Sequence, residues 1–371
     1  MNLIPAGKGI SNGSKMLEKR IVFFIGSMRR GGAERVISIL ANEYASKGWN
    51  VDIVVLLFNE VGYKLNDAVR IVDYTGNRKS RLGRVPYWLK SIRGYMKNEK
   101  PDSAVSFAAR INLLVLIASM GMKKEIIVSE RIDPMYDGRS WLVKLLINIF
   151  YPRSRAVVFQ TDRSMSYFGK KIKNNGVKIY NPVSVSTYAY GKTEKKIVTA
   201  GRLTAQKNQK LLVDVFGMLS ESYPEYTLWI YGEGELRDDL VKRANDLKVA
   251  EKVYLPGNVP DLHEKIKDAE IFVLSSDYEG LSNALLEAMM MGLPCISTRC
   301  AGSDEVIQDG INGLLVNVGD EISLKRAIVD LIENESLRKK ISENAKKSMG
   351  DFSRDVVMKQ WANVIEGHND K

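Results

Sequence analysis

The stretch IVFFIGSMRRGGAERVISILANEYASKGWNVDIVVLLF, residues 21–58, decides the fold of the N-terminal half. IVFFIG is a short apolar run that ends in glycine, which is typical of a buried parallel strand. From Ala33 onward apolar residues recur at helical spacing as far as Gly48, and VDIVVLLF then predicts a second strand. Strand, helix and strand in this order form a βαβ unit.

The same alternation continues along the chain. Three more apolar runs, AVSFAA, EIIVSE and AVVFQT, predict strands at residues 104–109, 125–130 and 156–161. The pattern restarts near residue 196, with strands predicted at 196–202, 226–234, 253–259, 271–276 and 292–298 and helices at 209–222, 235–249, 261–269 and 283–292. Such alternation favours doubly wound parallel sheets.

We therefore expect an α/β protein with two Rossmann-like, doubly wound domains at residues 1–185 and 186–350, which face a central cleft. A polar stretch at about residues 183–195 is the predicted linker between them. Ligands of such sheets bind outside the carboxyl ends of the strands, so the candidate site residues are those that follow a strand.

The composition argues against several classes of protein. Cys295 and Cys300 are the only cysteines, which excludes a disulfide framework. The only histidines are His263 and His368, so we expect neither a His-rich metal centre nor a Ser-His-Asp triad, and we expect His263 to be solvated. No run of 18 or more apolar residues predicts a membrane-spanning helix, and the N-terminus lacks the apolar core of a signal peptide. A cytoplasmic protein is expected.

The net charge of +11 is unevenly distributed. Residues 1–190 hold 31 Lys and Arg against 14 Asp and Glu, whereas residues 191–371 hold 24 against 30. A basic half of this kind predicts an anionic partner, which is nucleic acid, acidic lipid or a phosphorylated substrate. No recognisable nucleic-acid-binding module is present, so we expect no nucleic-acid partner.

Residues 78–100 carry eight Lys and Arg and one acidic residue, Glu99. Trp88, Leu89 and Ile92 share one helical face with Tyr95 or Met96, which is the pattern of an amphipathic helix on an anionic membrane surface. The alternative is a helix that packs this face on the sheet.

Polar residues follow two strands of the N-terminal half. Gly31 and Gly32 stand between the first strand and its helix, where the free N–H groups of a helix N-terminus can hold a phosphate. Glu130, Arg131 and Asp133 follow a later strand and are candidate acceptor-binding residues. Neither a G-x-G-x-x-G fingerprint nor a Walker A motif occurs there, which argues against a dehydrogenase or a P-loop ATPase.

Charged residues follow two strands of the C-terminal half. Arg202 and Lys207 stand at the mouth of a strand-to-helix loop and make a plausible diphosphate clamp, the alternative being two solvated charges. Glu279 lies in a loop just before a helix, and Glu287 lies inside that helix, so that both carboxylates can reach one ligand. The alternative is an ordinary turn followed by an ordinary helix.

The pair Glu279–Glu287 forms an E-x7-E pattern that resembles the signature of retaining glycosyltransferases of family 4. The segments GGAER, NPV, GRLTAQKNQ, YGEGELRDDL and GSDEVIQDGINGLLV are similar to other blocks of that family and occur in its order. The resemblance extends from about residue 20 to 365 and implies the GT-B architecture. It also implies that residues 351–371 form a helix that crosses back to the N-terminal domain, anchored by Trp361.

The resemblance implies roles for the candidate residues. Glu279 would hold hydroxyls of the donor sugar, and Glu287 would contact the ribose of the nucleotide. Arg202 and Lys207 would hold the donor diphosphate. The remaining contacts would come from backbone N–H groups and the glycine loop, namely Gly280, Leu281, Gly31 and Gly32. Many members carry a histidine that touches the donor sugar where this chain has Arg131.

The function implied is a retaining transfer of a hexose or N-acetylhexosamine, with N-acetylgalactosamine as the best choice, from a UDP-sugar to a glycan linked to undecaprenyl diphosphate. The enzyme would lie on the inner face of the cell membrane. No D-x-D motif occurs, so no metal cofactor is expected. The alternatives are a non-hydrolysing UDP-sugar 2-epimerase, which the scarcity of histidine disfavours, and a degenerate transferase acting as a partner subunit.

Overall fold

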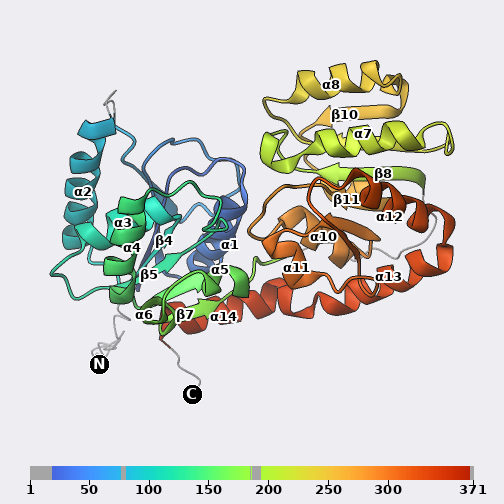
Figure 1. Cartoon of the computed structure of the whole chain (residues 1–371). Coiled ribbons are helices and arrows are strands. Elements are labelled where there is room, and N and C mark those ends of the chain that lie inside the picture. The colour runs from blue at the N-terminus through green and yellow to red at the C-terminus, as the bar shows by residue number, and fades with distance from the viewer. Residues whose placement is uncertain (1–18, 77–80, 184, 186–193, 368–371) are drawn as a thin grey trace, which may run out of the picture.

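A computed structural model describes residues 19–76, 81–183, 185 and 194–367, so most of the predicted linker and residues 78–80 of the basic segment lie outside the described residues. The chain forms two parallel sheets, one in each half (Figure 1). Every strand pairing in them is parallel. The expected α/β fold with two doubly wound sheets is confirmed.

The first sheet has the order β3-β2-β1-β4-β5-β6-β7. Its strands are β1 Arg20–Ile25, β2 Asn50–Val55, β3 Val69–Asp73, β4 Ser103–Phe107, β5 Glu125–Ser129, β6 Ala156–Phe159 and β7 Gly176–Lys178. The helices of this half are α1 Gly32–Ser46, α2 Arg81–Asn98, α3 Ala109–Ala118, α4 Trp141–Phe150, α5 Asp162–Ser166 and α6 Lys170–Lys173, with a 3-10 turn η1 at Tyr151–Arg153.

The second sheet has the order β10-β9-β8-β11-β12-β13. Its strands are β8 Glu194–Ala200, β9 Thr227–Tyr231, β10 Val253–Gly257, β11 Ala269–Leu274, β12 Cys295–Thr298 and β13 Leu314–Val316. The helices are α7 Gln209–Leu219, α8 Arg237–Asp246, α9 Leu262–Ile266, α10 Asn283–Met291, α11 Ala301–Val306, α12 Glu321–Glu333 and α13 Glu335–Ser348, with 3-10 turns η2 Ala205–Lys207, η3 Ala250–Lys252 and η4 Gly350–Phe352.

Strand β1 shows why the central strands are apolar throughout. Successive side chains of a strand point to opposite faces, and both faces of this sheet are covered. Val22 and Phe24 pack in a core with α2, α3 and α4. Ile21 and Phe23 pack in the opposite core with α1 and with the last helix, α14, Arg354–Glu366. The order of strands reverses beside β1 and beside β8, and a ligand crevice opens at such points.

Helix α14 returns from the C-terminal half and packs on the first sheet (Figure 1). Trp361 is fully buried, and its ring stacks on Phe107 with 5.9 Å between centroids. The Ser103 hydroxyl donates to the Ile365 carbonyl at 2.9 Å. The last helix of the chain is therefore part of the N-terminal core.

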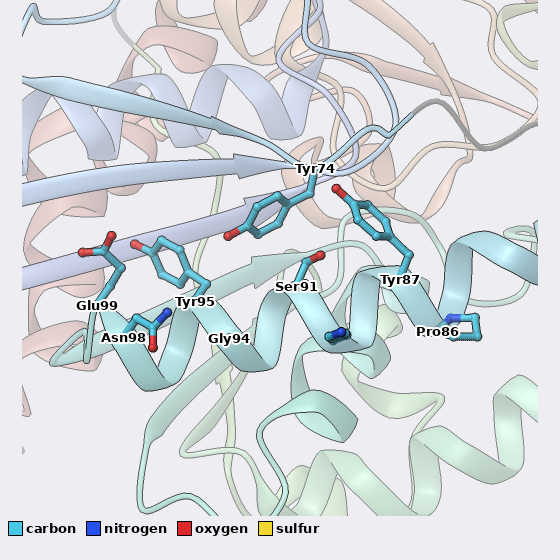
Figure 2. A pocket seen from close by; sticks show the side chains of 9 residues that line it. Tyr74, Pro86, Tyr87, Ser91, Gly94, Tyr95, Asn98 and Glu99 are labelled. Carbon is cyan, nitrogen blue, oxygen red and sulfur yellow. The ribbon is translucent and has the colours of Figure 1, made fainter.

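Helix α2 corrects the expectation for the basic segment. Trp88, Ile92, Tyr95 and Met96, the face expected to meet lipid, are buried in the core with the sheet and α3. The Trp88 indole donates to the Tyr74 carbonyl at 3.0 Å. Figure 2 shows Tyr95 turned toward the strands, beside a surface hollow of about 580 Å³. The apolar face of α2 is thus a packing face, and the prediction that it binds lipid is wrong.

We predict that Trp361→Ala destabilises the N-terminal domain by about 3–5 kcal/mol, because it leaves a cavity under Phe107. Urea unfolding of the full chain would measure this. Val356→Ala, at an exposed position of the same helix, is the control and should change the midpoint little. Equal effects of the two substitutions would contradict the assignment of α14 to the core.

Candidate active site

A cleft of about 730 Å³ lies between the two halves, at the carboxyl ends of β1, β8, β9 and β10. Both domains line it, the first with Arg30, Gly31, Arg35, Gly62, Tyr63 and Lys64, and the second with Gly201, Arg202, Tyr231, Asn258, His263 and Glu287 among others. A concave site at the switch point of two doubly wound sheets is the expected place for a ligand.

Glu279 and Lys207 are brought into contact at one edge of this region. Lys207, in η2 after β8, forms an ion pair with Oε1 of Glu279, which lies in the loop after β11. The Ser276 hydroxyl donates to the same oxygen at 2.9 Å. Glu279 is only 7% exposed, so the carboxylate is held between fixed donors. The lysine and the serine hydroxyl therefore fix the position of this carboxylate.

The loop that carries Glu279 is tied to the loop that carries Lys207. The Gln206 amide donates to the Tyr278 carbonyl at 2.9 Å, and the Asn208 amide donates to Asp277 at 2.7 Å. Asn208 has a positive φ of 43°, and its side chain caps α7. This left-handed residue ends η2 directly after Lys207, so it helps to fix the backbone position of the lysine.

Glu287 lies on α10, whose first turn is capped by Ser282. The carboxylate is 5% exposed and has two partners. Oε1 pairs with the Arg35 guanidinium, from α1 of the other domain, and Oε2 lies 3.0 Å from Nε2 of His263, on α9. The two domains are therefore joined through this glutamate.

The expectation that His263 is solvated is wrong, because it lines the cleft against Glu287. Burial lowers the pKa of His263, and the Arg35 charge lowers it further, so the ring is neutral at pH 7 and can donate one hydrogen bond to the carboxylate. Sequence reasoning missed both Arg35 and His263. Arg35 ends the same GGAER segment that supplied Gly31 and Gly32, and this proximity was the available signal.

Arg202 and Gly31 both line the cleft, each from a different domain. Gly31 caps α1, its N–H donates to the Tyr63 hydroxyl at 3.1 Å, and that hydroxyl donates to the Gly31 carbonyl at 2.8 Å. Burial raises the pKa of Glu34, on the first turn of α1, while the Arg202 charge acts to lower it. The Arg202 cation is thus close enough to the N-terminus of α1 to act on a charged group there. Gly32 instead faces Asn283 of the second domain.

Gly280 and Leu281 sit where the domains touch. A Cβ on Gly280 would lie 2.8 Å from Oε1 of Gln160 and 3.0 Å from the Arg131 carbonyl, so a larger residue would displace Gln160 and crowd the Arg131 backbone. The Leu281 carbonyl accepts from the Asn181 amide at 3.3 Å, and the same amide donates to Asn283 at 2.6 Å. The NPV segment, through Asn181, therefore supports the loop that carries Gly280 and Leu281.

None of the three predicted acceptor residues is among the residues that line the cleft. Glu130 is 2% exposed and pairs with Arg139 at 2.7 Å and with the Tyr151 hydroxyl. Asp133 is equally buried and accepts from the Met135 N–H at 3.0 Å. Direct contact of these two carboxylates with an acceptor is not supported in this arrangement.

Arg131 occupies a buried position between the domains. Its guanidinium lies over Phe107 and Trp361, 4.7 and 5.4 Å from the ring centroids. One nitrogen donates to Asn181 at 3.0 Å, and burial lowers the pKa of Arg131 to about 9. Arg131 therefore links the N-terminal core to the Asn181 support, and its contact with an acceptor stays a prediction.

Neither cysteine is a nucleophile in this arrangement. Burial raises the pKa of the Cys300 thiol to about 11 and raises that of Cys295 further, so both stay protonated at neutral pH.

Within the described residues, no three or more His, Cys, Asp or Glu side chains form a group that could hold a metal ion.

The sequence of residues 187–348 matches the family described as Glycosyl transferases group 1. The chain therefore carries a group 1 glycosyltransferase domain in its C-terminal half. Over 93% of its length it is 28% identical to 98% of a GalNAc-α-(1→4)-GalNAc-α-(1→3)-diNAcBac-PP-undecaprenol α-1,4-N-acetyl-D-galactosaminyltransferase of Campylobacter jejuni. Over 90% of its length it is 26% identical to 96% of LpsE, a lipopolysaccharide core biosynthesis glycosyltransferase of Rhizobium meliloti. These relatives support the expected hexosyltransferase activity.

Solved structures of glycosyltransferases share the fold of this enzyme. HepE of Anabaena, in complex with UDP, has a TM-score of 0.78 at 17% identity, with 94% of this chain and 100% of HepE covered. The lipopolysaccharide outer core galactosyltransferase WaaB, in its apo form, has a TM-score of 0.75 at 20% identity, with 94% and 99% covered. The expected GT-B architecture is confirmed.

We predict that Gly302→Ala lowers the turnover of the glycosyltransferase by about 100-fold, because small misplacements of substrate-holding groups cost rates of this order. A Cβ on Gly302, in α11, would collide with the Gly280 carbonyl and push the loop of Glu279 out of place. Steady-state kinetics would measure the loss. Gly350→Ala is the control, since a Cβ there has open space and the backbone is unstrained. Normal turnover of the Gly302 variant would show that the loop does not need this geometry.

Proposed function

We propose that this glycosyltransferase is a retaining enzyme that transfers a hexose or N-acetylhexosamine from a UDP-sugar to a glycan acceptor linked to a lipid diphosphate. The observation that carries the proposal is the Lys207–Glu279 pair, which lies beside the cleft that Arg202 and Glu287 line from the same domain. Two cations follow β8, one carboxylate follows β11 and the other lies on the next helix, α10. This set matches the needs of a sugar diphosphate, which has negative charge on one part and hydroxyls on the other.

Arg202 and Lys207 would neutralise the charge that builds on the leaving diphosphate. Fixed cations aimed at developing charge lower the barrier most effectively in a site that excludes water. The backbone N–H groups of Gly280, Leu281 and the glycine loop would add neutral donors. With this charge supplied by side chains, and with no D-x-D motif in the sequence, we propose that turnover needs no metal.

Glu279 would accept hydrogen bonds from donor-sugar hydroxyls, and Glu287 would accept them from the ribose. Both carboxylates are nearly buried and already hydrogen-bonded, so they are fixed before the donor arrives. Arg35 of the N-terminal domain forms an ion pair with Glu287 of the second domain. A ribose bound to Glu287 would therefore also affect a contact between the two domains.

The choice of donor and acceptor is supported by the relatives and by charge. The relative of Campylobacter jejuni is named for an undecaprenol-diphosphate-linked substrate and for N-acetylgalactosamine transfer, and HepE binds UDP. The basic N-terminal half suits an acceptor with a diphosphate at an acidic membrane surface. We therefore propose UDP-N-acetylgalactosamine as the donor and a peripheral place on the inner face of the cell membrane.

A panel of UDP-, GDP- and ADP-sugars, scored by donor hydrolysis and by thermal stabilisation, tests the donor. A selective response to UDP-N-acetylgalactosamine is expected, with no loss in EDTA. Interconversion of a UDP-sugar without an acceptor would favour the 2-epimerase alternative, and loss of turnover in EDTA would overturn the metal-independent mechanism.

Arg202→Ala and Lys207→Ala should each lower turnover by about 100-fold or more, because each removes a cation from the leaving group. Stopped or continuous assays of UDP release would measure this. Lys210→Ala is the matched control: Lys210 lies three residues further on, is 61% exposed in its side chain and pairs with Asp214 on α7. Turnover near that of the wild type in both cleft variants would refute the assignment.

A further inference from the structure

Helix α4 has an apolar outer surface that none of the described residues covers. Of its ten residues, WLVKLLINIF, Ile147 is the buried one. Trp141 is 75% exposed, and Leu142, Leu145 and Ile149 are 48%, 47% and 43% exposed. Residues 142, 145 and 149 recur at helical spacing, so they form one stripe, with Trp141 beside Leu145. Contiguous exposure of large apolar side chains marks an interaction surface.

The loop before α4 extends this apolar character. Met135 is 61% exposed, and Ile132 is 50% exposed. In the same loop the Tyr136 ring stacks on Tyr278, with 5.2 Å between centroids and 12° between planes. Tyr278 precedes Glu279, so the segment that leads into α4 also contacts the catalytic loop of the second domain.

The charges next to α4 are positive. Lys144 and Arg153 are exposed on α4 and on η1, which continues it. Helix α6, which packs beside η1, adds the exposed Lys170, Lys171 and Lys173. Asp162 is the one acidic residue in the sequence from 138 to 193, and it pairs with Lys178 at 2.6 Å. An apolar stripe bordered by lysine and arginine is complementary to an anionic lipid surface, where both kinds of side chain find partners.

We propose that α4 docks this enzyme on an anionic bilayer, with Trp141, Leu142, Leu145 and Ile149 inserted among the lipids and with α6 against the headgroups. No described helix is long and apolar enough to cross a bilayer, so the contact is an interfacial one. The inference rests on the proposed lipid-linked acceptor, and it locates the docking on α4 in place of α2. Because the loop before α4 touches the catalytic loop, docking would hold the transferase cleft near the lipid surface.

Flotation of the full chain with vesicles tests this. Vesicles of phosphatidylcholine with about 30% phosphatidylglycerol, at an ionic strength of about 0.15 M, should carry the wild type, and pure phosphatidylcholine should carry much less. The double variant Trp141→Ser/Leu145→Ser should lose binding by about 10-fold or more. Ile322→Ser is the matched control, since Ile322 is 74% exposed on α12 in the other domain and should not matter.

Several outcomes would overturn the proposal. They are wild-type flotation that is absent or independent of anionic lipid, a double variant that floats like the wild type, and loss of binding with Lys90→Glu/Lys97→Glu on α2 alone. A vesicle-independent dimer in light scattering that the double variant abolishes would assign α4 to a second copy instead. The α4 variants should keep wild-type hydrolysis of the UDP-sugar. Lys207→Ala should float like the wild type, and normal turnover of that variant would contradict the proposed transferase chemistry but not the docking.

Discussion

Parallel strand pairing constrains this chain more than any other interaction, because it brings the carboxyl ends of all strands in a sheet to one edge. In the second sheet the switch point lies between β8 and β11. Lys207 follows β8, and Glu279 follows β11, so the sheet alone brings them together although 72 residues separate them. The ion pair then needs only two short loops, which Gln206 and Asn208 tie to each other.

The two domains are joined by polar contacts at the cleft and by an apolar contact behind it. Arg35 reaches across to Glu287, and Asn181 supports Leu281 and Asn283. Behind them α14 carries Trp361 into the N-terminal core. The polar contacts lie at the proposed donor site, so a nucleotide sugar bound there would meet side chains that also join the domains. Arg131, held between Trp361 and Asn181, connects the two kinds of contact.

Two helices of the N-terminal half, α2 and α4, place their apolar side chains differently. Helix α2 is basic, but its apolar side chains fill the core. Helix α4 has few charges, and half of its apolar side chains face outward. Both patterns are amphipathic in the sequence, and helical periodicity cannot say whether an apolar face meets a sheet or a lipid. That difference depends on which face the sheet already covers.

The sequence by itself determined the central strands, the α/β class and the residue types at the strand ends. Buried parallel strands are continuous apolar runs, and the E-x7-E segment contains both of its glutamates within one loop and helix. The edge strands β3, with VRIVD, and β7, with GVK, were not predictable in this way, because their partial burial breaks the apolar run. Only the tertiary structure decided that Arg35 meets Glu287 across 252 residues, that His263 lines the cleft, and that Glu130 and Asp133 are buried. Such contacts depend on how two separately folded sheets face each other, and no local periodicity carries that information.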